Sequence, residues 1–163
     1  MKNMWNWRNV ELRRNVGRCY DGGDQGDRAM ITVMQTIFDN KLGDCGRACI
    51  ASILELPITS VPNFSESEEK WWKAYDEFAE KHGFIILEFQ ADEWNVPKFY
   101  HIKIGKSPRG EYNHAVVGFG DEVVHDPFPD GGGLDGNAKL IDVLVPIDPA
   151  RFRMTAAIKE SGQ

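Results

Sequence analysis

Residues 43–50 read Gly-Asp-Cys-Gly-Arg-Ala-Cys-Ile, and this stretch decides how the rest of the chain is interpreted. The aspartate is typical of a helix start, and the small and apolar residues after it predict a mostly buried helix from Asp44 to Leu56. That helix carries Cys45 in its first turn. His114 then opens an apolar stretch, and Asp126 follows it. A cysteine at a helix start, a strand histidine and a downstream carboxylate follow one another as in a thiol enzyme.

The elements around this helix predict an α+β fold. Ser65 and Glu68 form a capping box, and aromatic residues then recur at helical spacing, so a second helix is expected over about Ser65 to His82. Residues 31–38 form an extended approach to the first helix. Short apolar segments follow the second helix, at residues 84–89, 99–104, 114–119, 122–125 and 140–147. Helices first and strands afterwards predict an antiparallel sheet, with residues 127–136 as a loop.

Composition and charge narrow the class of protein. The chain has 163 residues, of which 42% are hydrophobic, and this suits one domain with one core. Its net charge of −6 argues against nucleic acid as a partner, and no polybasic run, long apolar stretch or secretory signal indicates a membrane or export. Three cysteines cannot close a disulfide framework. We therefore expect a soluble, cytoplasmic protein with reduced thiols that binds neither nucleic acid nor membrane.

The two ends read differently from the middle of the chain. Residues 1–29 end in a run of Gly, Asp and Gln, which predicts a flexible N-terminal arm. Two interpretations of this arm stand side by side: it lies upstream of a natural start at Met30, or it docks on the domain through Trp5 and Trp7. The domain itself is expected over residues 30–155, and residues 156–163 are expected to be a disordered tail.

The proposed chemistry assigns one role to each of three residues. A thiol attacks as a thiolate, and a helix dipole with a nearby imidazolium lowers its pKa, so we expect Cys45 to be the nucleophile. His114 begins a strand, from which it takes the thiol proton and returns it to the leaving amine. A hairpin around Gly120-Asp121 brings Asp126 back to the histidine, where it holds the imidazole tautomer.

These motifs resemble those of the papain-like cysteine peptidase superfamily. The bacteriocin-processing peptidases of export transporters share three of them: Asp44-Cys45-Gly46, His114 and Asp126-Pro127. Small papain-like proteins of bacteria and phages share a longer linked set: Ala51 to Pro57, Val61 to Phe64, Ser107 to Gly110, His114 to Gly118 and Val124 to Pro127. The resemblance covers roughly residues 34–134. It implies a papain-like fold, in which the helix with the cysteine packs on an antiparallel sheet with the histidine and aspartate. We expect no cofactor and no metal.

The sequence departs from the papain-like pattern at the oxyanion hole. The family has a glutamine six residues before the cysteine, and here that position is Asp39, with Gln35 ten residues ahead of Cys45. Three alternatives follow: Gln35 reaches the site across an inserted turn, Asn40 replaces it, or backbone N–H groups act alone. We favour Gln35, because residues 41–43 can absorb the extra length as a loop.

The remaining candidates have plainer interpretations. Cys49 lies one helical turn after Cys45 and is expected to be a core residue. His125 is expected to be structural, bonding the turn around Pro127, and His82 and His101 are not ligand candidates. The aromatic residues Trp71, Trp72 and Trp94 are expected in the core or at its rim before any groove. A zinc site is disfavoured because the CxxC spacing of structural zinc is missing; its ligands would be Cys45, Cys49, His114 and Asp126.

Three functions fit this set of residues. The first is hydrolysis of a peptide, isopeptide or other amide bond in a protein or peptide substrate, through a thioacyl intermediate on Cys45. The second is acyl transfer or deamidation by the same triad, because water or an amine can resolve the thioester. The third is a non-catalytic binding protein, for example a phage or mobile-element factor that captures a host protein. The sequence leaves the substrate and the oligomeric state open.

Overall fold

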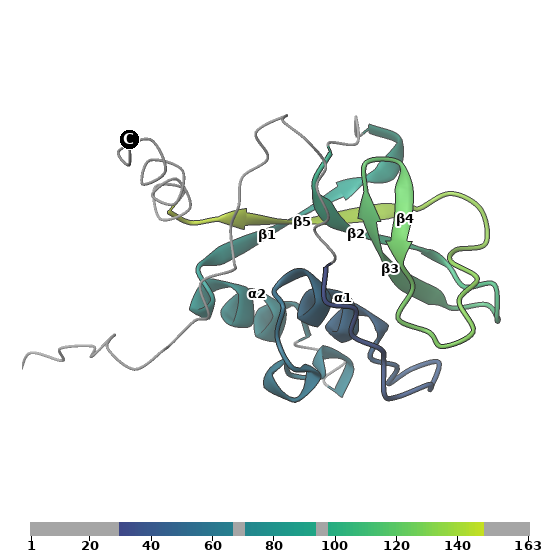
Figure 1. Ribbon diagram of the computed structural model, residues 1–163, viewed down its shortest axis with the longest axis horizontal. Coiled ribbons are helices and arrows are strands. Elements are labelled where there is room, and N and C mark those ends of the chain that lie inside the picture. Colours follow the sequence, from purple (N-terminus) through teal and green to yellow (C-terminus); the bar gives the residue numbers. More distant parts are fainter. Residues whose placement is uncertain (1–29, 67–70, 94–97, 149–163) are drawn as a thin grey trace, which may run out of the picture. The chain divides into compact units, whose positions relative to one another are not determined.

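The computed structural model describes residues 30–66, 71–93 and 98–148, all of which belong to one compact unit, Asp24–Asp148. The predicted N-terminal arm, the whole predicted tail (156–163), residues 149–155 of the predicted domain and Trp94 lie outside the described residues. Two α-helices, α1 (Cys45–Ile53) and α2 (Trp71–Lys81), lie on the same side of a five-stranded antiparallel sheet (Figure 1). The predicted α+β class is therefore confirmed. No helix in the described part of the chain is long and apolar enough to cross a membrane.

The sheet pairs its first strand with its last and keeps the other three in chain order. Its order is β1-β5-β2-β3-β4, so the last strand inserts between the first and the second. The bounds of the strands are β1 Phe84–Gln90, β2 Tyr100–Lys106, β3 Asn113–Phe119, β4 Glu122–His125 and β5 Leu140–Pro146. Three short 3-10 helices complete the fold: η2 Ile58–Ser60, η3 Phe64–Glu66 and η4 Ala91–Glu93. The five predicted strand segments agree with these strands to within two residues at each end.

The first helix ends earlier than predicted. The N–H of Leu56 donates to the carbonyl of Ala51, and the N–H of Glu55 donates to the carbonyl of Ser52. Glu55 adopts a left-handed conformation with φ 53°, and the pattern of bonds is that of a Schellman motif. The chain therefore leaves the helix after Ile53, although the composition up to Leu56 is still helical.

The segment before the second helix differs from the prediction. Ser65 lies in η3, and its hydroxyl donates to the carbonyl of Gly43 at 3.1 Å. Ser65 therefore does not lie in the α-helix as predicted; α2 is described from Trp71, and Glu68, the other half of the expected capping box, lies outside the described residues. Ser65 instead ties the segment before α2 to the segment before α1.

The core forms where the helices meet the sheet. Helix α1 packs against β3 and β2, and α2 packs against β1. All but one of the buried residues of α1 are small, which allows close approach to the sheet; they are Ala48, Cys49, Ala51 and Ser52, beside the larger Ile50. Around α2 the core is aromatic, with Phe64 packed edge-on against Tyr75 at 5.1 Å and against Phe78 at 5.8 Å. The two helices thus bury different kinds of surface.

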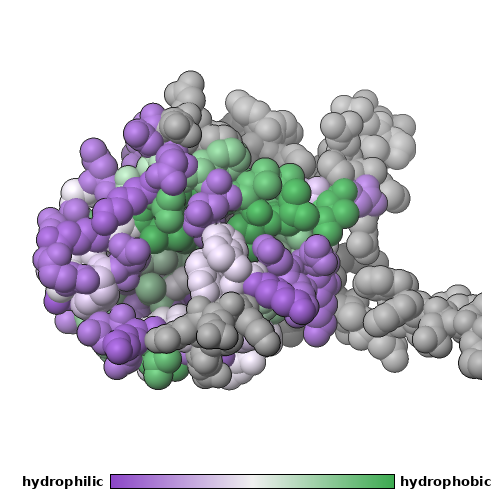
Figure 2. Space-filling view, turned by 180° about the vertical axis from the view of Figure 1, so that it is seen from behind, coloured by the Kyte–Doolittle hydropathy of each residue, from purple (hydrophilic) through white to green (hydrophobic). Residues whose placement is uncertain are grey.

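The opposite face of the sheet keeps apolar residues at the surface. Glu88 pairs with Asp142, which bonds to Tyr75 of α2, so the alternation of β1 turns Ile85 and Leu87 to the other face. Both side chains are about two-fifths exposed, at 41% and 40%. Viewed from behind, apolar residues gather over this part of the molecule (Figure 2).

A bulge in the β3–β4 hairpin decides where Asp126 lies. The strands turn at Gly120, with φ 57°, as the sequence predicted, but their register shifts between Val117 and Gly118, so that Val117 pairs with His125. Continuing this register sets Asp126 opposite Val116. Directly opposed residues share a face, and so do residues two apart on one strand. The bulge therefore turns the carboxylate to the same face as His114, whereas an unbroken register would have turned it away.

Candidate active site

A cavity of about 270 Å³ opens at the N-terminal end of α1. Three of the four predicted site residues line it: Cys45, His114 and Gln35. The fourth, Asp126, lies behind the histidine and bonds to it. The structure thus brings together four residues that span more than half of the described chain.

Cys45 is the first residue of α1, and it is half-buried at the wall of the cavity. Backbone N–H groups of Ala115, Gly46 and Cys45 itself point at the sulfur and favour the thiolate. Burial opposes them, and so does the neighbouring carboxylate of Asp44, so the pKa of the thiol is raised above its ordinary value. The expectation of a lowered pKa was therefore wrong, because desolvation outweighs the helix terminus.

His114 is buried near the start of β3 and is held by one ring nitrogen. Its Nε2 donates to Oδ1 of Asp126 at 2.8 Å. Burial lowers the pKa of His114, and the nearby cation of Arg109 adds to this, while the bond to Asp126 acts in the opposite direction. A neutral ring with its proton on Nε2 keeps Nδ1 as an acceptor. His114 is therefore able to take a proton at Nδ1.

Asp126 is held by four donors. Besides His114, the N–H of Phe128 donates to Oδ1 and the N–H of Gly133 donates to Oδ2, each at 2.8 Å, and Nη2 of Arg109 lies 3.4 Å from Oδ2. Burial raises the pKa of this carboxyl, but the bonds from His114, Phe128 and Gly133 outweigh it and hold the pKa below its ordinary value. The site carboxylate is therefore charged at neutral pH.

The loop after β4 is shaped around this carboxylate. Three consecutive glycines at 131–133 have φ values of 66°, 104° and 63°, a conformation that other residues adopt only with strain. This allows the chain to curl until the Gly133 N–H meets Asp126. The sequence interpreted residues 127–136 only as a loop, and the structure shows that the loop binds a carboxylate.

Gln35 is buried beside Cys45, as the preferred alternative requires. Its backbone N–H donates to the carbonyl of Pro127 at 3.0 Å, and its side-chain Nε2 donates to the carbonyl of Ile37 at 3.0 Å. Its Oε1 is buried without a hydrogen-bond partner. Asn40 also lines the cavity, but it is exposed and lies in the turn before α1. The inserted turn over residues 40–42 therefore brings both amides to the cavity, with Gln35 the more firmly held.

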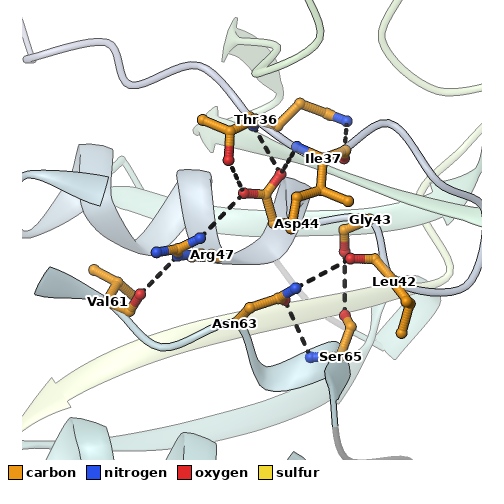
Figure 3. A network of polar contacts seen from close by, with 10 residues as sticks. Thr36, Ile37, Leu42, Gly43, Asp44, Arg47, Val61, Asn63 and Ser65 are labelled. Atoms are coloured by element: carbon orange, nitrogen blue, oxygen red, sulfur yellow. Dashed lines mark hydrogen bonds and ion pairs between the residues drawn. The ribbon is translucent and has the colours of Figure 1, made fainter. Parts of the chain in front are cut away.

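The sequence analysis missed the role of Asp44. This residue is 1% exposed, and its carboxylate forms no capping bond to α1. It accepts hydrogen bonds from the Thr36 N–H at 2.9 Å, the Thr36 hydroxyl at 2.8 Å and the Ile37 N–H at 2.8 Å, and it lies 3.4 Å from Arg47 (Figure 3). Asp44 thus fixes the segment that carries Gln35 against the helix that carries Cys45. Its position before a helix suggested only a cap.

A second set of bonds closes the turn before α1. The side-chain amide of Asn63 donates to the carbonyl of Leu42 at 3.1 Å, and Ser65 donates to the carbonyl of Gly43 (Figure 3). Gly43 itself has no room for a side chain, because an added Cβ would lie 2.4 Å from the carbonyl oxygen of Asp39. The segment before α1 is therefore held by two separate sets of bonds, those of Asp44 and those of Asn63 and Ser65.

Arg109 and Phe128 were also missed. Arg109 comes from the turn between β2 and β3, which the sequence suggested only as a turn, and its guanidinium lies 3.7 Å from the ring centre of Phe128. Phe128 in turn contacts the rings of Phe38 and His114, at 5.3 and 6.5 Å. In the sequence, only the shared motif Ser107 to Gly110 indicated that Arg109 could matter.

The plainer interpretations can be compared with the structure. Cys49 is fully buried on α1, as predicted. His125 is structural, but its Nε2 donates to the carbonyl of Val33 at 2.9 Å and not to the turn at Pro127. His82 and His101 donate through Nδ1 to backbone carbonyls, and within the described ranges no three His, Cys, Asp or Glu residues are grouped to hold a metal.

Comparison of the chain with protein-family models, with curated proteins and with solved structures found no match. The function is therefore argued from the chemistry of the cavity.

Proposed function

We propose that this protein is a cysteine hydrolase of amide bonds, with Cys45 as nucleophile, His114 as general base and acid, and Asp126 as the carboxylate that orients the histidine. One observation carries the proposal: a thiol and a carboxylate-bound imidazole line one cavity. Such a pair, with the base oriented by a third group, is the arrangement of an activated nucleophile. It also supports the likeness to papain-like peptidases.

In the first half-reaction the Cys45 sulfur attacks the carbonyl carbon of the amide. Nδ1 of His114 accepts the thiol proton as the S–C bond forms. The C–N bond then breaks, and the imidazolium gives the same proton to the departing amine. The product is a thioester on Cys45 and a free amine.

In the second half-reaction water attacks the thioester. His114 accepts a proton from the water, the C–O bond forms, and the C–S bond breaks. The proton returns to the sulfur, so that the thiol is restored and a carboxylic acid leaves. An amine in place of the water gives acyl transfer, and a side-chain amide in place of a peptide bond gives deamidation.

Negative charge on the carbonyl oxygen needs donors that are already in position. The backbone N–H groups of Cys45 and Gly46 point at the sulfur at rest, and we assign them to the carbonyl oxygen that comes beside the sulfur as the S–C bond forms. Nε2 of Gln35 has a second hydrogen beyond the one that bonds Ile37, and we assign it to the same oxygen.

The resting pair is uncharged in this proposal. Burial raises the pKa of Cys45 and lowers the pKa of His114, and both directions favour thiol and neutral imidazole. Proton transfer then accompanies attack on the substrate and does not precede it. A cavity of about 270 Å³ is small for a ligand site, which favours a single side chain or chain end of a protein or peptide as its occupant. A thiol nucleophile also suits the reducing cytoplasm, and no cofactor is needed.

The first test measures alkylation by limiting iodoacetamide with intact-mass detection, from pH 5 to pH 9. The measurement uses a Cys19→Ala background, because the chain has a third cysteine at that position. We expect one label at Cys45, and a rate at pH 7 that falls about tenfold or more in His114→Ala. Cys49→Ala serves as the matched thiol control and retains the label. An unchanged rate in His114→Ala would contradict the proposed pair.

The second test identifies the reaction. Wild type and Cys45→Ala are incubated with a peptide library, and products are read by mass spectrometry as new chain ends, deamidated side chains or amine adducts. We expect new chain ends that need Cys45. If no product forms but a partner binds equally to Cys45→Ala, the protein is a binding module.

A further inference from the structure

We propose that Arg109 is a positioning residue, which holds the carboxylate of Asp126 in the orientation that bonds His114. This inference rests on the proposed function of Cys45, His114 and Asp126, and it assigns a role to a residue that does not itself touch the reacting atoms.

Three contacts fix Arg109 beside the carboxylate. Nη2 lies 3.4 Å from Oδ2 of Asp126, and the same nitrogen donates to the carbonyl of Gly131. The guanidinium plane packs over the ring of Phe128 at 3.7 Å. Asp126 and Gly131 belong to the two arms of the loop after β4, so one side chain joins both arms.

Arginine suits this place better than lysine. A planar guanidinium packs on an aromatic ring and donates in its own plane at the same time, whereas an ammonium is a compact point charge. Arg109 is itself anchored, since its backbone N–H donates to the Ser107 hydroxyl at 3.2 Å and Ser107 is buried. The turn between β2 and β3 thus presents a fixed cation to the loop.

The two carboxylate oxygens are divided between two sets of donors. Oδ1 accepts from His114 and from the Phe128 N–H, and Oδ2 accepts from the Gly133 N–H and faces Arg109. A carboxyl group that is bonded at Oδ2 cannot rotate without losing those bonds. Oδ1 therefore stays directed at Nε2 of His114.

Charge gives Arg109 a second effect that can be measured. The charged or titratable groups that face His114 are Asp126 from the loop after β4, Arg109 from the β2–β3 turn and Cys45 from α1; its partner on β2, Gly105, is uncharged. The cation of Arg109 opposes protonation of His114. Removing this charge must therefore change the titration of the histidine, even if the loop stays folded.

The test compares three variants. Arg109→Gln removes both the charge and the planar guanidinium donors, Arg109→Lys keeps the charge alone, and Lys106→Gln is the matched control. Lys106 lies at the end of β2, and its amine pairs with Glu111 and Asp135, not with Asp126. For each, the titration midpoint of His114 is followed by NMR, with its ring signal assigned by comparison with His114→Ala. Alkylation of Cys45 at pH 7 and the melting temperature are measured on the same samples.

We expect Arg109→Gln to raise the His114 midpoint by about half a pH unit or more and to slow Cys45 alkylation about tenfold. In Arg109→Lys the His114 midpoint stays near that of wild type, but the alkylation rate still falls, because the planar guanidinium donors are lost. Lys106→Gln changes neither quantity.

Two results would overturn the role of Arg109. One is a fall in melting temperature in both Arg109 variants with an unchanged midpoint, which describes a loop support only. The other is an equal midpoint shift in Lys106→Gln, which describes a general charge effect. The midpoint needs no substrate, and failure of the proposed function shows separately, as alkylation that is unchanged in His114→Ala.

Discussion

Two carboxyl groups, one just beyond the edge strand β4 and one inside the interior strand β5, behave in opposite ways. Asp126, beyond β4, receives four donors, and its pKa is held below the ordinary value. Asp142, in β5, is 3% exposed and accepts one hydrogen bond, from the hydroxyl of Tyr75 at 3.0 Å, while its Oδ1 has no partner. Burial raises the pKa of Asp142 to about 7. Burial alone therefore does not decide the charge of a carboxyl group; the number of donors around it does.

The two surroundings differ for a structural reason. Asp126 follows a strand and enters a glycine-rich loop, whose free N–H groups can turn toward it. Asp142 lies inside a strand between β1 and β2, where backbone N–H groups belong to the sheet ladder. Its neighbour across the ladder is Glu88, which adds a like charge and disfavours ionisation. A loop can solvate a carboxylate, and a central strand cannot.

The largest effect is expected from exchanging each carboxyl for an amide. Asp126→Asn should lower amide hydrolysis by on the order of a thousandfold, because both oxygens of Asp126 face N–H donors and an amide nitrogen can accept from none of them. Asp142→Asn, the matched buried exchange, should leave the rate within about twofold. Hydrolysis of a library-selected peptide measures both. Equal losses would mean that the two acids do not differ in role.

The oxyanion hole gives the next effect and separates the two amides at the cavity. Gln35→Ala should slow hydrolysis about a hundredfold, while Asn40→Ala should be nearly silent. Alkylation of Cys45 develops no oxyanion, so its rate should stay unchanged in both variants. The reverse order of the two losses would move the assignment to Asn40.

The pH dependence of stability tests directly whether Asp142 is uncharged in the folded protein. The folded protein keeps a proton on Asp142 that the unfolded chain releases above about pH 4. This contribution to stability is complete below about pH 4 and is lost as the pH rises to about 7. We expect the free energy of unfolding of wild type to fall over this range by up to about 4 kcal/mol relative to Asp142→Asn.

Denaturant unfolding from pH 4 to pH 8 measures that difference, with Asp76→Asn as an exposed control on α2. Parallel pH profiles of wild type and Asp142→Asn would show that Asp142 is charged in the fold. The comparison of the two carboxyls would then be wrong.

The last prediction concerns the carboxylate that supports Gln35. Asp44→Ala leaves the Thr36 and Ile37 donors without their buried acceptor, which should cost about 2 to 3 kcal/mol of stability. The control is Asp39→Ala, because Asp39 accepts two backbone N–H groups in an exposed turn. Thermal and denaturant unfolding compare the two. Equal losses would mean that Asp44 is only another turn residue.

Sequence patterns predicted the elements well and their ends less well. The apolar segments bounded by turns predicted the positions of all five described strands, because buried strands need apolar residues in short runs between turns. The C-terminal end of α1 was wrong by three residues, and Ser65 was wrongly placed in the second helix. Glu55 ends α1 in a left-handed conformation that its residue type does not signal, and Ser65 bonds to a carbonyl 22 residues away instead of capping α2.

The sequence by itself determined the kinds of groups that the site contains and the elements that carry them: a thiol at a helix start, an imidazole on a strand and a carboxylate after a hairpin. The tertiary structure decided their ionisation. Burial raises the pKa of Cys45 and lowers that of His114, and donors from two turns keep Asp126 charged. A bulge at Val117 turns that carboxylate toward the histidine. These effects depend on atoms brought together from distant parts of the chain, so a local sequence pattern does not predict them.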